Sequence, residues 1–108
     1  MLMIDRAKSY FKHFSKKDID SLSNMFSQNI RLEDWTVKLK GKKEVINFNK
    51  KLFKKVKNLK VEKRKIYKLN NIIFAFIIVH ADKKKIKVLD VIKFDKKGLI
   101  LSIDAYHG

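Results

Sequence analysis

Residues 72–106 read IIFAFIIVHADKKKIKVLDVIKFDKKGLILSIDAY, and this stretch decides the fold. It holds three apolar runs, at 72–81, 86–94 and 99–106, that are rich in the β-branched and aromatic residues favoured in strands. Polar turns separate the runs, and Gly98 in the second turn suits the positive φ that tight hairpins need. We therefore expect an antiparallel meander at this end of the chain.

The residues before position 59 instead show the spacing of amphipathic helices, with apolar side chains three and four positions apart. We expect helices over residues 2–14, 18–26 and 42–57, a strand over 30–37 and another over 59–69. Helices first and a meander last predict an α+β domain, in which three N-terminal helices pack on a curved antiparallel β-sheet in the order α-α-β-α-β-β-β-β. With 108 residues the chain has room for one domain, which we expect to span residues 1–108.

The chain is strongly basic, with 27 Lys and Arg against 11 Asp and Glu and a net charge of +16. Few of these basic residues are Arg, although the Arg fork is preferred for reading bases and binding phosphates. The Lys residues are spread along the whole chain, so we interpret the charge as a solvated surface and expect no nucleic-acid partner. The alternative, charge-driven binding of nucleic acid, would depend steeply on salt.

The sequence has no Cys, which excludes disulfides, thiolate metal sites and cysteine nucleophiles. Residues 1–6 lack the basic and then apolar pattern of a signal peptide. The longest apolar run, over residues 72–79, is far shorter than the ~20 residues that span a bilayer. We expect a cytoplasmic protein without membrane contact.

A first candidate for chemistry lies in residues 30–35, IRLEDW, where two adjacent carboxylates interrupt an apolar run. Strand alternation places Asp34 on the face of Ile30 and Leu32, which points it inward, whereas Glu33 falls on the other face. A carboxylate in a dry setting can act as a general base. An ion pair between Asp34 and one of the many Lys residues is the alternative.

Asp90 and Tyr10 are further candidates, because each is a polar residue in apolar surroundings. Asp90 shares its strand face with the apolar residues 86, 88, 92 and 94, so its carboxyl must be paired, hydrogen-bonded or protonated. A protonated carboxyl can donate a hydrogen bond to an oxygen of a ligand. Tyr10 lies on the buried stripe of the first helix, where its hydroxyl needs a partner: Asp90, a ligand oxygen or the backbone.

The run over residues 72–81 is apolar on both strand faces. One face is expected to cover the helices, and the other to pair with a second copy of the chain in a homodimer. His80 shares a face with Phe76 and Ile78, and we expect this face to line a pocket for a small apolar molecule; a packed structural histidine is the alternative. No spacing typical of metal ligands is present, so no metal site is expected. The residues predicted to bind the ligand are Trp35, Phe76, Ile78, His80, Ile103 and His107.

The layout resembles the nuclear transport factor 2-like superfamily, which includes SnoaL-like polyketide cyclases and Δ5-3-ketosteroid isomerases. Residues 10–34, which include Leu32-Glu33-Asp34, and residues 89–106, which begin with Leu89-Asp90, carry the similarity. It extends over nearly the whole chain. The resemblance implies a cystatin-like cone with a pocket between the helices and the sheet.

Among these relatives the ketosteroid isomerases are closest in motif, and they imply a role for each candidate. Asp34 would be the general base, Tyr10 an oxyanion donor, and Asp90 a second donor held neutral by an apolar site, as the family itself exemplifies. The implied activity is cofactor-independent proton transfer α to a carbonyl, in an isomerase or a SnoaL-like cyclase; a non-catalytic binding module is the alternative. Three departures from the family pattern, at Trp35, at His80 and in the short hairpin over 82–85, predict a pocket shaped for something other than a steroid.

Overall fold

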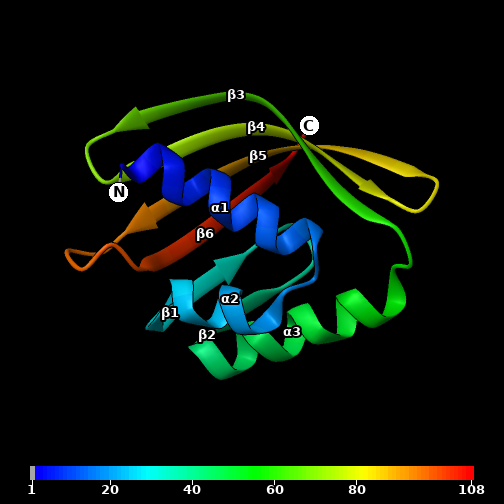
Figure 1. Ribbon diagram of the computed structural model, residues 1–108, viewed down its shortest axis with the longest axis horizontal. Helices are drawn as coiled ribbons and strands as arrows, with labels where there is room; N and C mark the ends of the chain where they lie inside the picture. The colour runs from blue at the N-terminus through cyan, green and yellow to red at the C-terminus, as the bar shows by residue number, and fades with distance from the viewer. Residues whose placement is uncertain (1) are drawn as a thin grey trace.

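The computed structural model describes residues 2–108 and forms a strongly curved sheet with the helices gathered on one side (Figure 1). In chain order the elements are α1 (Met3–Ser15), α2 (Ile19–Met25), β1 (Phe26–Glu33), β2 (Lys38–Lys40), α3 (Lys42–Lys55), β3 (Leu59–Leu69), β4 (Ile72–Ala81), β5 (Lys84–Phe94) and β6 (Ile100–His107). Helix α1 packs against β3 and β4, whereas α3 packs against β1 and β2, and α2 contacts both of these helices.

The six strands lie in the order β2-β1-β6-β5-β4-β3. The predicted α+β cone, with helices first and the meander last, is confirmed. The strand directions differ from the expected antiparallel sheet at one pair: β1 and β6 pair in parallel, whereas every other pair is antiparallel. These two strands are far apart in sequence, so no hairpin turn dictates their relative direction.

The strand predicted over residues 30–37 is divided into two. β1 ends at Glu33, and a turn that begins at Asp34 folds β2 back onto it, with Leu39 opposite Leu32. A short polar side chain such as that of Asp34 can bond to the backbone just ahead of it, which favours a turn over a continued strand. Gly41, with φ of 91°, then lets the chain leave β2 for α3.

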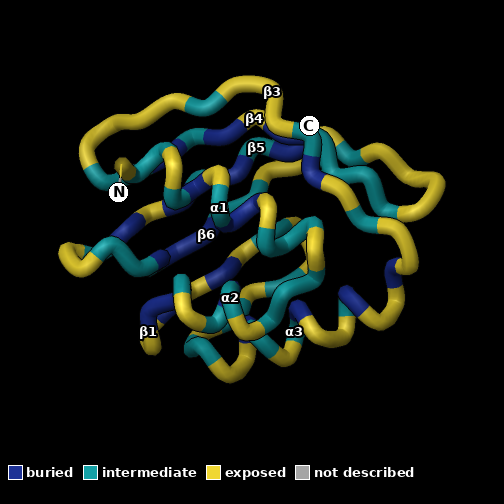
Figure 2. Tube along the Cα trace, viewed as in Figure 1, coloured by how far each residue is buried: buried dark blue, intermediate teal, exposed yellow. Residues whose placement is uncertain are grey.

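The core lies between the inner face of the sheet and the apolar stripes of the helices (Figure 2). Helix α1 buries Ala7, Tyr10 and Phe11, and α3 buries Val45 and Phe53, at the three- and four-residue spacing expected of amphipathic helices. The meander supplies the facing layer, so that one extended core joins both halves of the chain.

The sheet is bent by irregularities in its ladders, which shift the register between Lys63 and Lys65 of β3 and between Lys93 and Phe94 of β5. Such bulges bend a strand and increase its twist. The curved sheet therefore wraps around the helices and leaves space between the two layers. None of the helices within residues 2–108 has the length and apolar character needed to cross a membrane.

Candidate active site

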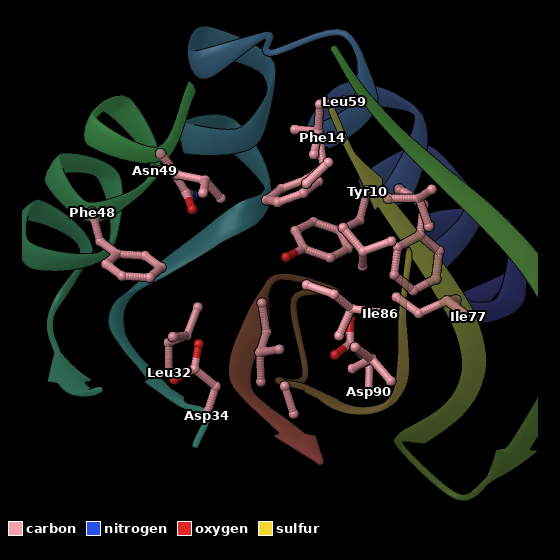
Figure 3. A pocket seen from close by; sticks show the side chains of 18 of the residues that line it. Tyr10, Phe14, Leu32, Asp34, Phe48, Asn49, Leu59, Ile77, Ile86 and Asp90 are labelled. Atoms are coloured by element: carbon pink, nitrogen blue, oxygen red, sulfur yellow. The ribbon is translucent and has the colours of Figure 1, made fainter. Parts of the chain in front are cut away.

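A cavity of about 260 Å³ opens between the helices and the inner face of the sheet (Figure 3). This volume lies just below the ~300–1,000 Å³ of pockets for drug-sized molecules, so the cavity suits a small ligand. Most of its wall is apolar and comes from α1, α3 and five of the strands. The lining side chains with a polar group are Tyr10, Asp34, Trp35, Thr36, Asn49 and Asp90.

Asp90 reaches the cavity from the middle of β5 and is only 7% exposed. Its cross-strand neighbours are the small residues Ala75 and Ala105, which leave room above its carboxyl group. Within residues 2–108 no group donates a hydrogen bond to this carboxyl, and no Lys or Arg nitrogen lies within 4.0 Å of it. Burial, and secondarily the negative charge of Asp34, raise the pKa of Asp90 to about 7. Of the three states open from the sequence, the protonated one fits these surroundings.

Tyr10 enters the same cavity from α1 and is 5% exposed. Its ring is held by neighbouring aromatic rings, with centroids 5.3 Å away for Phe11 and 6.2 Å away for Phe26. Burial, and secondarily the charge of Asp90, raise the pKa of the Tyr10 hydroxyl above its usual range. The hydroxyl is therefore neutral and able to donate, and no partner for it occurs among the hydrogen bonds of residues 2–108.

Asp34 follows β1 beside the exposed Trp35 and anchors the turn that ends the strand. Its Oδ1 accepts hydrogen bonds from the backbone N–H of Thr36 (2.6 Å), the Thr36 hydroxyl (2.7 Å) and the backbone N–H of Val37 (2.9 Å). These bonds fix the orientation of the carboxylate and leave Oδ2 without a donor from residues 2–108. The alternative of an ion pair with Lys is not found, because no such pair lies within 4.0 Å in the described chain.

The structure thus brings Asp34, Tyr10 and Asp90 to one cavity from three elements that are far apart in sequence (Figure 3). The arrangement combines a carboxylate held in one orientation, a neutral tyrosine hydroxyl and a carboxyl whose pKa is raised to about 7, at a mostly apolar cavity. A carboxylate can move a proton, and neutral donors aimed into a dry site stabilise a developing oxyanion.

Two of the six predicted ligand-binding residues, Trp35 and Ile103, line the cavity. Trp35 is 51% exposed and lies at the rim. His107 is not part of the cavity wall but touches the rim, with its ring centroid 5.0 Å from that of Trp35. Both rings border an adjoining surface depression that also reaches Asp34.

The other three, Phe76, Ile78 and His80, lie on the outer face of β4, so the strand face expected from the sequence is wrong. Ala75 of β4 is directly opposite Asp90, and side chains opposite each other in an antiparallel pair share a face. The inner residues of β4 are consequently Ala75, Ile77 and Val79. His80 instead places its Nε2 3.0 Å from Oε1 of Glu62 on the outer face.

Several wall residues were not predicted from the sequence. Most are apolar residues on the inner faces of the strands and on α1 and α3. Those on the strands could have been identified only with the correct strand parity. Asn49 is different, because it is a polar residue at helical spacing between Val45 and Phe53 on the buried stripe of α3. A polar interruption of an apolar stripe is a signal that the sequence does carry.

Comparison of the fold with solved structures shows close similarity at low sequence identity. A candidate SnoaL-like polyketide cyclase of Shewanella denitrificans superposes with a TM-score of 0.89 at 16% identity, over 98% of this chain and 90% of the other. An NTF2-like protein of Cytophaga hutchinsonii gives 0.87 at 15% identity, over 100% and 91%. A candidate ketosteroid isomerase of Kribbella flavida gives 0.84 at 9% identity, over 98% and 77%. These likenesses establish an NTF2-like cone.

The sequence itself matches the SnoaL-like domain over residues 7–103. The chain therefore belongs to the SnoaL-like family. No curated protein matches it in sequence. Within residues 2–108 no group of three or more His, Asp or Glu side chains is placed to hold a metal ion.

Proposed function

We propose that this protein catalyses cofactor-independent proton transfer next to the carbonyl group of a small, largely apolar molecule. The observation that carries the proposal is that Asp34, Tyr10 and Asp90 meet at one apolar cavity in which Asp90 has no counter-charge. A buried carboxyl without a partner costs stability, so its retention favours a functional role. The similarity to a candidate ketosteroid isomerase supports the same class of reaction.

In the proposed reaction the free Oδ2 of Asp34 removes a proton from the carbon α to the carbonyl. The electron pair of the broken C–H bond moves into the carbonyl, whose oxygen gains negative charge. The Tyr10 hydroxyl and the protonated Asp90 carboxyl donate hydrogen bonds to that oxygen and keep their own protons. With a β,γ-unsaturated ketone, Asp34 then returns the proton to the γ carbon, which gives the conjugated ketone and restores the carboxylate.

The expected contribution of each residue to the rate of turnover follows from its role. A positioned general base contributes about 10²–10⁴-fold, and removal of one donor to an oxyanion costs about 10²–10³-fold. The three hydrogen bonds to Oδ1 support this role of Asp34, because they hold the carboxylate in one orientation while Oδ2 stays free.

The test is turnover of a bicyclic β,γ-unsaturated ketone, followed by the ultraviolet absorbance of the conjugated product. Asp34→Asn preserves Oδ1 as the acceptor in the turn but removes the base, so we expect turnover to fall by at least ~10²-fold while the ketone still binds. Glu33→Gln is the matched control, because it removes a neighbouring carboxylate on the other face of β1. This variant should leave turnover unchanged.

The alternative, a non-catalytic binding module of the same fold, makes the opposite prediction. It requires that the wild-type chain bind the ketone without converting it, and that Asp34→Asn behave like the wild type. No conversion of any such ketone by the wild type would refute the isomerase proposal and leave the binding module.

We further propose that the outer face of the sheet pairs two copies of the chain. This face carries exposed aromatic residues, with Phe76 46% and Tyr106 59% exposed, and the ring of Tyr67 packs edge-on against Phe76 at a centroid distance of 6.4 Å. A twofold axis would place one such patch against its copy, which is the commonest way that soluble homodimers form. The cavity lies on the other side of the sheet and would stay open in this dimer.

A further inference from the structure

The side chain of Asn49 is the one polar group in the cavity wall that the proposed reaction does not use, apart from those of the Asp34 turn. It lies on the buried stripe of α3 and is only 2% exposed. Its Nδ2 is buried and has no hydrogen-bond partner in residues 2–108. In Figure 3 the amide extends from α3 toward the interior of the site, beside Phe48 and away from Asp90.

An amide in this position is costly for folding. The neighbours of Asn49 along the stripe, Val45 and Phe53, are buried apolar residues of the core. An unsatisfied buried donor destabilises a protein, and replacement by an apolar residue of similar size relieves that cost. A leucine would be the ordinary residue at this position, so the amide favours a role in binding.

We propose that Asn49 is a specificity residue that binds a hydroxyl group on the ligand, at the end remote from the reacting carbonyl. Rotation about the Cβ–Cγ bond lets the amide present either its oxygen or its NH₂ group to the cavity. A hydroxyl both donates and accepts a hydrogen bond, so it satisfies the amide in either orientation. The rest of the wall between Asn49 and Asp90 is mostly apolar.

The ligand class that fits both ends of the cavity is an apolar carbonyl compound with a second oxygen function. That assignment is part of the proposal for Asn49. It rests on the proposed function only in assigning the carbonyl end to Tyr10 and Asp90. The apolar body would contact the leucine, valine and isoleucine side chains of the walls, and the cavity of about 260 Å³ limits that body to a small ring system. Polar groups at both ends of an apolar slot fix the orientation of a ligand as well as its identity.

The test compares two bicyclic enones that differ only in a hydroxyl on the ring remote from the ketone. Their affinities are measured by quenching of Trp35, the single tryptophan of the chain, which lies at the rim of the cavity. We expect the wild type to bind the hydroxylated compound about 5- to 10-fold more tightly, which is the ordinary contribution of one neutral hydrogen bond. Asn49→Leu should abolish this preference, and Asn47→Leu, on the exposed side of the same helix, should preserve it.

The thermal unfolding midpoint of the unliganded chain provides a second readout. Asn49→Leu should raise it, because the variant removes a buried unsatisfied amide; a lowered midpoint would show a structural role and overturn the proposal. Equal affinity of the wild type for the two enones, or no measurable affinity for either, would also overturn it. Failure of the proposed catalysis can be distinguished from failure of the Asn49 proposal. If only catalysis fails, the chain converts no β,γ-unsaturated ketone but still binds the hydroxylated enone more tightly than the other.

Discussion

Replacement of Asp90 by Asn should stabilise the protein above neutral pH and change its stability little in acid. The pKa of Asp90 is about 7 in the folded chain against an ordinary value of 3.8. Between these two values the folded state keeps a proton that the unfolded state releases, so the free energy of unfolding falls as pH rises through this window and levels off above it. The full difference in pKa lowers the free energy of unfolding by ~4 kcal/mol, at about 1.4 kcal/mol per tenfold change in proton affinity. The Asn variant lacks the titrating group and avoids this loss.

The assay is urea unfolding of both chains at a series of pH values from about 4 to about 9, analysed by linear extrapolation. The stability difference between Asp90→Asn and the wild type should grow with pH by up to ~4 kcal/mol and become constant above about pH 7. Asp104→Asn, on the outer face of β6 opposite Val91, is the control; it keeps the Asp90 carboxyl, so its stability should still fall with pH through this window. A difference for Asp90→Asn that is flat over the whole range would refute the neutral carboxyl and with it the proposed donor.

Three further predictions concern Tyr10, the pH dependence of turnover and the outer face of the sheet. Tyr10→Phe should lower turnover by about 10²–10³-fold in the ketone assay yet change the unfolding free energy by no more than about 1 kcal/mol, because the hydroxyl has no protein partner; a large loss of stability with normal turnover would make it a core tyrosine. The value of kcat/KM should fall as pH rises through about 7, because Asp90 then loses the proton that it donates, and a pH–rate profile of Asp90→Asn should lack this decline. Phe76→Lys should convert a homodimer to monomers in sedimentation equilibrium, whereas Phe76→Leu should retain it; association unaffected by the Lys substitution would exclude the outer face.

Much of the fold could be predicted from the sequence because the local patterns and the long-range packing agree. The apolar spacing of residues 2–14 and 42–57 identified two helices within two residues of their ends. The polar turns between the three apolar runs of residues 72–106, with Gly98 in the second, marked two of the hairpins. The parallel pairing of β1 with β6 could not be predicted, because it depends on tertiary contacts between distant segments. The turn at Asp34 was missed because a side chain bonded to the backbone ahead of it ended the strand early.

The site was predicted as far as strand alternation is decisive. Asp90 sits among apolar residues of one strand parity, so alternation alone points its side chain toward the cavity. Asp34 follows the last residue of β1, and the cavity that it lines is on the side predicted from the parity of Ile30 and Leu32. Alternation could not identify the inner face of β4, because both faces of this strand are apolar. That face is set by the register that places Ala75 opposite Asp90. Asn49 interrupts an apolar helical stripe and could have been noticed from the sequence, but its unsatisfied amide is visible only in three dimensions.

The most direct test of proton transfer at carbon is exchange of the α-protons of a small cyclic ketone with solvent deuterium, followed by proton NMR. This measurement needs no double bond in the substrate and therefore isolates the step assigned to Asp34. The wild type should accelerate exchange over buffer by at least ~10²-fold, and Asp34→Asn should return it close to the buffer rate while Glu33→Gln does not. Exchange at the buffer rate in the wild type, or equal acceleration by Asp34→Asn, would contradict the assignment of Asp34 as the base.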